Sequence, residues 1–344
     1  MKSRRGQSGR IERTHAFHLA ACLFAVLLSG SLLAACGGDD GEQSETSAAQ
    51  PAPPAIDFPK ADGRPLEQVL SAATEEGPVV TPAARVLRPG ENRFSFGVFT
   101  LDREAITDAE VALYAAPRSL QGPAIGPFPA RIESLETEAA FRAKTTADDP
   151  DAAKVVYVSD IPLDQPGAWV FGALTKQGDG LGGSLVPTPS KVGQFDPPDT
   201  GDRAPVTNTD VASENPDISE IDTRVPTSSM HEENLADVLG KEPVVLLFAT
   251  PALCQSRICG PVVDVAEQVK RDYGDDVAFI HQEIYNDNDI SQGSRPQVID
   301  YDLPSEPWLF VIDRNGTIKT AIEGAFSAEE LERAVQRVSG APSA

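Results

Sequence analysis

Two cysteines five positions apart, Cys254 and Cys259, stand where a predicted strand passes into a predicted helix. Such a pair can be a reactive redox couple, a structural disulfide or a pair of metal ligands. A disulfide needs Cα atoms within about 7 Å, whereas five residues of regular helix rise about 7.5 Å. Both residues therefore cannot lie in regular helix and still bridge. Cys254 is expected in a loop or an irregular first turn, which Thr250-Pro251 after the strand would permit.

Neighbouring residues bear on the reactivity of the two thiols. The free N–H groups and the positive end of a helix stabilise a nearby thiolate. Arg257 lies between the cysteines in sequence and could add a cation. A carboxylate at Glu306 would instead raise the pKa of a thiol near it, because negative charge disfavours the thiolate. The sequence leaves open which cysteine attacks and which resolves.

The segment from residue 213 onward predicts alternating helices and strands that would position the cysteines. Continuous apolar runs predict buried strands, apolar residues at helical spacing predict amphipathic helices, and Asp-Arg-Asn-Gly predicts a hairpin turn. The expected elements, in chain order, are a helix starting at the Ser229–Glu232 capping box, a strand at 243–249, a helix from Pro261 to Gly274, a strand at 277–280, paired strands at 308–312 and 317–322, and a helix capped by Ser327.

Two histidines follow the predicted signal segment, and neither is assigned a chemical role. His231, beside Met230 in the expected first turn of a helix, is predicted to lie at the surface. His281, at the end of a strand, is predicted to be packed or solvated rather than a ligand. The acidic segment 284–297 lacks the oxygen spacing of an EF-hand loop and is interpreted as solvated. No metal site and no cofactor is therefore assigned.

The element order and two sequence signatures together resemble the thioredoxin fold over a little more than a third of the chain. The signatures are Cys-Gly-Pro at Cys259–Pro261 and the hairpin sequence LFVIDRNGTI. The resemblance implies a cis peptide bond before Pro307, facing the cysteines, and thiol–disulfide exchange by Cys254 and Cys259. The chain departs from the thioredoxin pattern in having four residues between the cysteines and Val262 where the second cysteine would stand.

Other interpretations of the cysteine pair stay open. A structural disulfide would make the chain a non-enzymatic binding or scaffold protein. The segment Thr250–Cys254 resembles the Thr-Pro-x-Cys signature of peroxiredoxins, with one residue too many. Sco-type copper chaperones pair two cysteines with a histidine, a role for which His231 and His281 remain in the predicted mature chain.

The N-terminal 35 residues have the anatomy of a secretory signal, because a cationic stretch precedes the apolar run 16–35. The run ends at Leu33–Cys36, Leu-Ala-Ala-Cys, which resembles a bacterial lipobox. The resemblance implies that Cys36 is acylated and anchors the protein in the lipid bilayer, at the outer face of the bacterial cytoplasmic membrane. An uncleaved transmembrane helix is the alternative. Cys254 and Cys259 would then be the remaining thiols, and such a pair in an exported protein is normally oxidised or cycles through oxidation.

The charge of the chain excludes one class of partner. The 344 residues carry a net charge of −23, with Lys, Arg and His together far outnumbered by Asp and Glu. Binding to nucleic acid needs a basic face, so no nucleic-acid partner is predicted.

Residues 65–190 predict an all-β domain. Short apolar-alternating segments separated by Gly- and Pro-containing turns are typical of a β-sandwich, and they are similar to the immunoglobulin-like modules of bacterial surface proteins. Trp169 is expected in its core. Composition places a flexible tether at 36–64 and a linker at 191–212, which leaves 213–344 as the thioredoxin-like domain.

The sequence therefore predicts a multidomain, lipid-anchored extracytoplasmic protein with an Ig-like β-sandwich and an α/β thioredoxin-like domain. Cys254 and Cys259 would exchange thiols and disulfides with exported proteins or with a membrane reductant. The supporting residues would be Arg257, Glu306 and Pro307.

Overall fold

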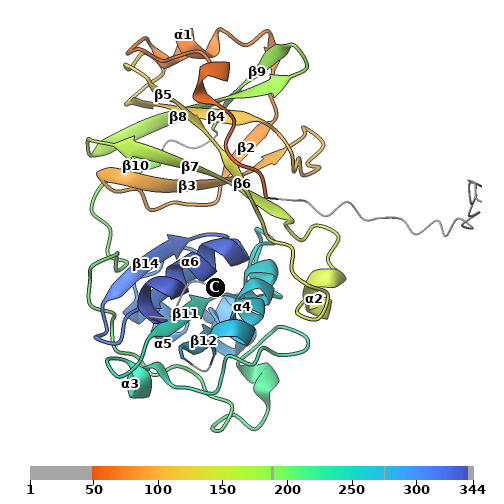
Figure 1. Ribbon diagram of the computed structural model, residues 1–344, viewed down its shortest axis with the longest axis vertical. Helices are drawn as coiled ribbons and strands as arrows, with labels where there is room; N and C mark the ends of the chain where they lie inside the picture. Colours follow the sequence, from red (N-terminus) through yellow and green to blue (C-terminus); the bar gives the residue numbers. More distant parts are fainter. Residues whose placement is uncertain (1–48, 187–189, 275, 340–344) are drawn as a thin grey trace, which may run out of the picture. The chain divides into compact units, whose positions relative to one another are not determined.

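The computed structural model describes residues 49–186, 190–274 and 276–339 (Figure 1). The predicted signal segment, Cys36 and most of the predicted tether lie outside the described residues. Within the described ranges, every helix is too short or too polar to cross a membrane. The structure is rich in β-strands, which form three sheets with few helices.

Two sheets form the N-terminal region, residues 49–192. One has six strands in the order β1-β9-β8-β4-β5, with β10 also paired to β8; the other has four, in the order β2-β3-β7-β6. The six-stranded sheet comprises β1 (Glu75–Glu76), β4 (Val111–Pro117), β5 (Ile125–Pro129), β8 (Gly167–Gln177), β9 (Gly180–Leu185) and β10 (Ser190–Val192). The four-stranded sheet comprises β2 (Val79–Pro82), β3 (Gly90–Phe99), β6 (Arg131–Ser134) and β7 (Val155–Leu163).

The two sheets face each other across a shared apolar core. Phe94 and Phe96 of β3 point into this core together with Phe171 of β8, and the rings of Phe94 and Phe171 stack with centroids 4.8 Å apart. Trp169 is in the same cluster and is 2% exposed, as predicted. Alternation along β3 thus buries one face of one sheet against one face of the other.

The outer face of the six-stranded sheet is also buried, so β4 has buried side chains on both faces. Ala112 and Tyr114 pack beneath Leu66 of helix α1 (Leu66–Leu70) and beneath Phe58 and Ala61, which precede it. Ordered packing therefore begins within the segment predicted as a tether up to residue 64. The apolar residues of that segment are sparse, which is why its composition indicated a flexible chain.

The C-terminal α/β region, residues 213–339, is built on a four-stranded sheet in the order β12-β11-β13-β14. Strands β11 and β12 are parallel, and β13 is antiparallel to both of its neighbours. The strands are β11 (Val244–Phe248), β12 (Ala278–Gln282), β13 (Trp308–Ile312) and β14 (Ile318–Glu323). The helices are η2 (Ile218–Glu220), α3 (Leu235–Val238), α4 (Cys259–Tyr273), η3 (Asn286–Asn288), η4 (Ile290–Gln292), α5 (Pro296–Asp300) and α6 (Ala328–Ser339).

Helices cover both faces of this sheet because every side chain of β11 is apolar and buried. Val245 and Leu247 pack in the cluster that contains α4 and α6. Their neighbours Val244, Leu246 and Phe248 pack in a second cluster with α3 and α5. Figure 1 shows α4 and α6 together over the sheet. The sequence-based prediction of these strands, of α4 and of the Ser327-capped last helix is confirmed.

The predicted start of α3, at the Ser229–Glu232 capping box, is wrong. The helix begins at Leu235 and is capped by Asn234, whose side chain accepts from the N–H of Ala236. Ser229 is engaged elsewhere, because its backbone N–H and its hydroxyl both donate to Glu267 on α4. The chain just before α3 is therefore non-helical, and it buries Ser228, Met230 and His231.

The N-terminal region and the C-terminal α/β region share a hydrophobic cluster. Leu135, Val156 and Val158 pack with residues of α4 and α6. Polar contacts border this cluster, and in one buried contact the hydroxyl of Ser327 donates to Glu133 over 2.6 Å. Both faces of β7 are therefore covered, since its alternate residues pack between the two sheets of the N-terminal region.

Residues 201–207, within the segment predicted as a linker, pair with the C-terminal α/β region. The N–H of Ala204 donates to the carbonyl of Gly316 in the β13–β14 turn, and the carbonyl of Asp202 accepts from the N–H of Ile318. The hydroxyl of Thr207 donates to Asp300 over 2.6 Å. These bonds fix the later half of that segment alongside the sheet.

The ion pair between α6 and the four-stranded sheet of the N-terminal region gives a stability prediction. Glu330 accepts from Arg93 over 2.6 Å and from Arg131 over 3.2 Å, and its side chain is 9% exposed. Although burial acts to raise the pKa of Glu330, the two arginines lower it. Glu330→Ala should reduce the free energy of unfolding by about 1.5–3 kcal/mol, because it removes charge-assisted hydrogen bonds from two partly buried arginines. Urea unfolding measures this loss.

The matched control is Lys144→Ala, which removes a pair with Asp148 whose side chains are 72% and 66% exposed. Exposed pairs contribute little, so the control should cost less than about 0.5 kcal/mol. Equal losses in the two variants would show that the α6 contact does not stabilise the protein.

Candidate functional site

The loop between β11 and α4 brings the two cysteines together. The carbonyl of Thr250 accepts from the N–H groups of Leu253 and Cys254, and the N–H of Arg257 donates to the carbonyl of Cys254. Arg257 has a left-handed backbone, with φ of 59°. The loop therefore folds back on itself, and α4 starts only at Cys259. Cys254 lies outside the regular helix, as the spacing argument required.

Both cysteines are free thiols and both are buried, with Cys254 5% exposed and Cys259 fully covered. A hydrogen bond from the Cys259 thiol, acting against burial, lowers the pKa of Cys254 to about 6. The hydroxyl of Ser256, 3.2 Å from the Cys254 sulfur, and the N–H groups of Ile258 and Cys259 lower it further. The open N-terminal end of α4 thus stabilises a thiolate at Cys254.

The pKa of the Cys259 thiol is shifted in the opposite direction, upward. Burial raises the pKa of Cys259 well above its usual value, and the neighbouring Cys254 and Glu306 raise it further. The pair is therefore asymmetric: Cys254 is the thiolate at neutral pH, and Cys259 is the protonated donor beneath it. This asymmetry makes Cys254 the more acidic of the two thiols, a difference that the sequence did not decide.

Glu306 and Tyr285 interact electrostatically with the cysteines, and Pro307 follows Glu306 in the chain. The Glu306–Pro307 peptide bond is cis, as predicted. Burial and then the charge of Cys254 raise the pKa of Glu306, while Arg85 lowers it. Burial and then Glu306 raise the pKa of Tyr285, with smaller contributions from both cysteines. Arg85 comes from the N-terminal region, so both regions contribute charge near the thiols.

Tyr285 was not among the predicted site residues, because it begins the segment 284–297 that was interpreted as solvated. The signal that could have identified it is its place just after β12, at the same sheet edge where β11 ends. Because β11 and β12 are parallel, their carboxyl ends lie side by side.

The guanidinium of Arg257 pairs with a carboxylate away from the cysteines. The prediction that it would add a cation near the sulfurs is therefore wrong. Its Nη1 donates to Asp149 over 3.1 Å, and its carbonyl accepts from the N–H of Ala153. Its guanidinium is about half exposed. The left-handed backbone at this position directs the side chain outward, toward the segment that follows α2 (Lys144–Ala147). Backbone N–H groups and the neighbouring thiol, rather than Arg257, lower the pKa of Cys254.

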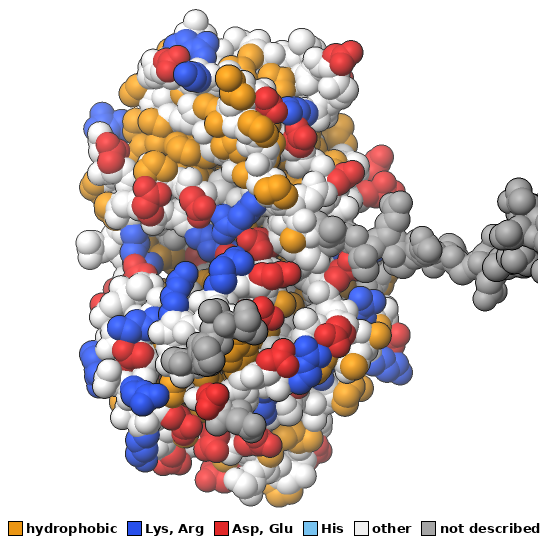
Figure 2. Space-filling model, viewed as in Figure 1, with side chains coloured by type: hydrophobic (Ala, Val, Ile, Leu, Met, Phe, Trp, Pro, Cys, Tyr) orange, Lys and Arg blue, Asp and Glu red, His pale blue; other side chains and the backbone are white. Residues whose placement is uncertain are grey.

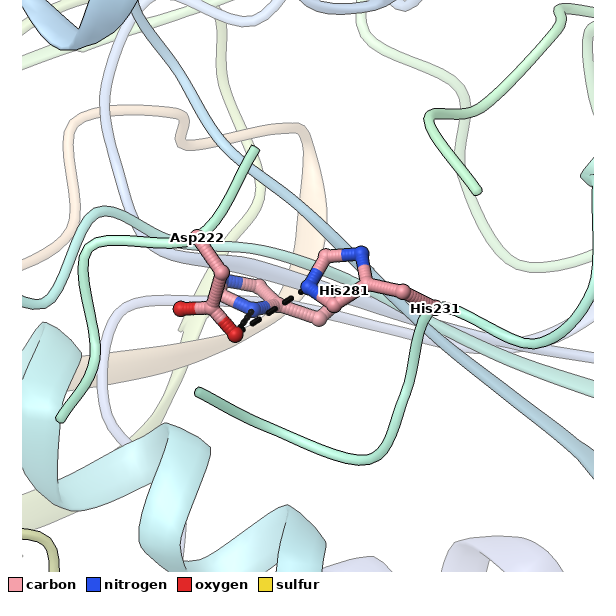
Figure 3. A group of neighbouring side chains, drawn as sticks. All are labelled: Asp222, His231 and His281. Carbon is pink, nitrogen blue, oxygen red and sulfur yellow. Dashed lines mark hydrogen bonds and ion pairs between the residues drawn. The ribbon is translucent and has the colours of Figure 1, made fainter. Parts of the chain in front are cut away.

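A second cluster of chemically active side chains lies in the interior. Asp222, His231 and His281 converge there, and they are 1%, 2% and 0% exposed (Figure 3). The Nε2 of His231 lies 3.1 Å from Oδ2 of Asp222, and the Nδ1 of His281 lies 3.6 Å from the same oxygen. Despite burial, His281 and His231 hold the pKa of Asp222 far below its usual range. Despite burial, Asp222 raises the pKa of His281.

The predicted surface position of His231 is wrong. The coil before α3 turns Met230 and His231 inward, and Met230 joins the core beneath α4. The rings of His231 and His281 lie 5.3 Å apart and face Asp222 rather than a cysteine. No signal in the sequence points to Asp222, because the spacing of the three residues matches no motif.

A chain of hydrogen bonds connects this interior to the cysteine loop. Glu283 accepts from both the N–H and the hydroxyl of Thr223, and that hydroxyl accepts from the N–H of Ala252 over 3.0 Å. The Nε2 of His281 lies 3.1 Å from the carbonyl of Ala249, the first residue after β11. The buried polar side chains thereby hold the loop that carries Cys254.

Comparisons with known proteins identify no family. No protein-family model matches the chain, and no curated protein matches it. Among solved structures, it is similar to a thiol:disulfide interchange protein of the thioredoxin family from Chlorobium tepidum TLS. The two share 16% sequence identity with a TM-score of 0.30, and the match covers 41% of this chain and 97% of that chain.

The asymmetry of the thiols predicts a pH profile for alkylation. Cys254 should react with iodoacetamide with a midpoint near pH 6, because only the thiolate attacks and its fraction rises as the pH passes the pKa of about 6. In Cys259→Ala the midpoint should move upward, since the hydrogen bond from Cys259 is lost. The pH dependence of the rate, followed by mass spectrometry, measures both midpoints.

Cys254→Ala is the matched control, and in it the remaining Cys259 should react slowly below about pH 9. Equal rates at Cys254 in one variant and at Cys259 in the other would contradict the assignment of Cys254 as the more acidic thiol.

Proposed function

We propose that the protein catalyses thiol–disulfide exchange through Cys254 and Cys259, on a C-terminal α/β region of thioredoxin-like fold. The observation that carries the proposal is the contact between a thiol of lowered pKa and a buried thiol of raised pKa at the start of α4. A disulfide with only a structural role needs no such difference in pKa between its two thiols. The cis bond between Pro307 and Glu306, whose charge acts on Cys259, agrees with the thioredoxin resemblance.

The exchange balances as two substitutions at sulfur. The Cys254 thiolate attacks one sulfur of a partner disulfide, an S–S bond forms between them, and the partner's other sulfur leaves as a thiolate that takes up a proton. Cys259 then loses its proton and attacks the Cys254 sulfur, which releases the second partner thiolate. The pair ends as a Cys254–Cys259 disulfide and the partner gains two electrons. A thiol reductant must return the pair to the dithiol.

The partners that fit the sequence are disulfides of other exported proteins, with a membrane reductant to restore the dithiol. We propose that acylated Cys36 holds the protein at the outer face of the bacterial cytoplasmic membrane, because the Leu33–Cys36 sequence follows a secretory signal pattern. The mixed charges on the surface are compatible with protein partners: acidic and basic side chains intermingle on the face drawn in Figure 2.

One observation favours the alternative of a binding or scaffold lipoprotein with a structural disulfide. The sulfurs are nearly inaccessible, at 5% and 0% exposure, so a protein disulfide could reach Cys254 only after the loop moved. In that alternative, the two-sheet N-terminal region, proposed as an Ig-like β-sandwich, would be the binding surface.

The reduction potential separates the two functions. An exchange protein should have a potential between roughly −120 and −270 mV, whereas a structural disulfide should lie below about −300 mV. Equilibration of the full chain with a dithiol redox buffer, followed by trapping and counting of the thiols, gives this value. A potential below about −300 mV would reject the exchange function.

Glu306→Gln tests which charges set the potential. Removing the carboxylate should lower the pKa of Cys259, stabilise the reduced form and make the pair more oxidising by on the order of 10–30 mV. Glu329→Gln, an exposed charge on α6, is the matched control and should leave the potential unchanged. An unchanged potential in Glu306→Gln would show that its charge does not act on the thiols.

The anchor is tested separately. Cys36→Ala should abolish incorporation of labelled fatty acid and release the protein from the membrane fraction, because the acylated residue is removed. Fractionation of cells that express the variant, with the unaltered chain as control, measures this. Firm membrane association of the variant would point to an uncleaved helix instead.

A further inference from the structure

The buried group Asp222, His231 and His281 takes part in no step of the thiol chemistry. One atom from each residue, all within 4.8 Å of one another, forms a compact set of nitrogen and oxygen atoms (Figure 3). Asp222 and His231 come from the coil before α3, and His281 comes from β12. The group therefore joins a segment with little secondary structure to the central sheet.

The outer nitrogen of each imidazole ring faces a carbonyl oxygen. The Nε2 of His281 lies 3.1 Å from the carbonyl of Ala249, and the Nδ1 of His231 lies 3.4 Å from that of Asp210. A carbonyl can only accept, so these nitrogens carry hydrogen. In a neutral ring the other nitrogen is then a lone pair. Both lone pairs would then point at the carboxylate of Asp222, so a cation must lie between them, either a proton on a ring nitrogen or a metal ion.

Two charged neighbours of this group supply no free positive charge. Glu283, two residues after His281 in the chain, is fully buried. Its Oε2 has no hydrogen-bond partner among the residues the structure describes. Arg224, the nearest arginine in sequence to Asp222, is paired with Asp264 over 2.9 Å.

Asp222 accepts from the backbone N–H groups of Arg224 and Ser228, over 2.8 and 2.6 Å, which compensate its charge only in part. A bound cation would offset the remaining cost of burying two carboxylates so close to His281.

We propose that Asp222, His231 and His281 bind a divalent transition-metal ion of the zinc class. Ligands of a tetrahedral zinc ion, at bond lengths of about 2.0–2.1 Å, lie about 3.3 Å apart. The distances from Oδ2 of Asp222 to the two facing nitrogens, 3.1 and 3.6 Å, bracket this value. Imidazole and carboxylate are ordinary zinc ligands, and an outer N–H bonded to a carbonyl is the usual way in which a ligating histidine is oriented.

The site is distinct from the proposed exchange function, because it includes no cysteine. Its role would be structural: the metal would pin the coil at 222–231 to β12, next to the carbonyl of Ala249 that starts the cysteine loop. Since the ligands are buried, the ion would enter as the chain folds, and its binding would add directly to the free energy of folding.

The experiment uses the full chain with all four cysteines replaced by Ser and with no histidine tag, so that thiolates cannot bind the ion. The chain is refolded with Zn²⁺ or Co²⁺ and desalted, and its metal content is measured by mass spectrometry. One equivalent should be retained, and the unfolding temperature should rise with the Zn²⁺ concentration. The visible spectrum of the Co²⁺ form should be that of a tetrahedral site with nitrogen and oxygen ligands.

Variants assign the ligands. His231→Gln and His281→Gln should lose the retained metal, whereas Asp289→Asn, in the acidic segment 284–297, should keep it. Undiminished metal in both histidine variants would overturn the proposal. If those variants do not fold, the spectrum decides, because the cysteine-free chain has its ligand set intact. A chain that folds without retaining metal would also overturn it. The group would then be a hydrogen-bonded network in which the Ser228 hydroxyl, 3.3 Å away, donates to Nδ1 of His281.

Discussion

The burial of β11 on both faces is the constraint on which the rest of the C-terminal α/β region depends. Every one of its five side chains is apolar and covered, so the sheet needs a helical layer on each side. This fixes α4 against one face, and the short connection from Phe248 to Cys259 must then turn back sharply to enter it. The two cysteines and the carbonyl of Ala249, which accepts from His281, lie within this turn.

Asymmetry between the thiols follows from where each one sits relative to the start of α4. Cys254 lies before the helix, where the N–H groups of Ile258 and Cys259 are free to donate to its sulfur. Cys259 is the first helical residue, faces the core and has no water around it. The five-residue separation of the cysteines, which rules out a disulfide within regular helix, has a second consequence. It allows one sulfur to meet the helix end and the other to be buried.

The N-terminal region is part of the environment of this site and is not only a neighbour in sequence. Arg85 acts on the pKa of Glu306, and Asp149 binds Arg257. Gly260 also reflects the contact, because a Cβ there would lie 2.9 Å from the hydroxyl of Thr146. The apolar residues Leu135 and Val156 close the core beneath α4. A change in the N-terminal region can therefore alter the cysteine loop through packing and through charge.

The sequence by itself determined the elements whose signals are local. The apolar run of β11, the helical period of α4, the Asp-Arg-Asn-Gly hairpin and the Ser327 cap are all set by neighbouring residues, and so is the rule that Cys254 lies outside the helix. Tertiary structure alone decided which thiol is acidic, that Arg257 turns to Asp149, and that Asp222, His231 and His281 converge. The reason is physical: burial and convergence depend on residues far apart in the chain, and a coil such as 222–231 has no periodic pattern to indicate which of its side chains face inward.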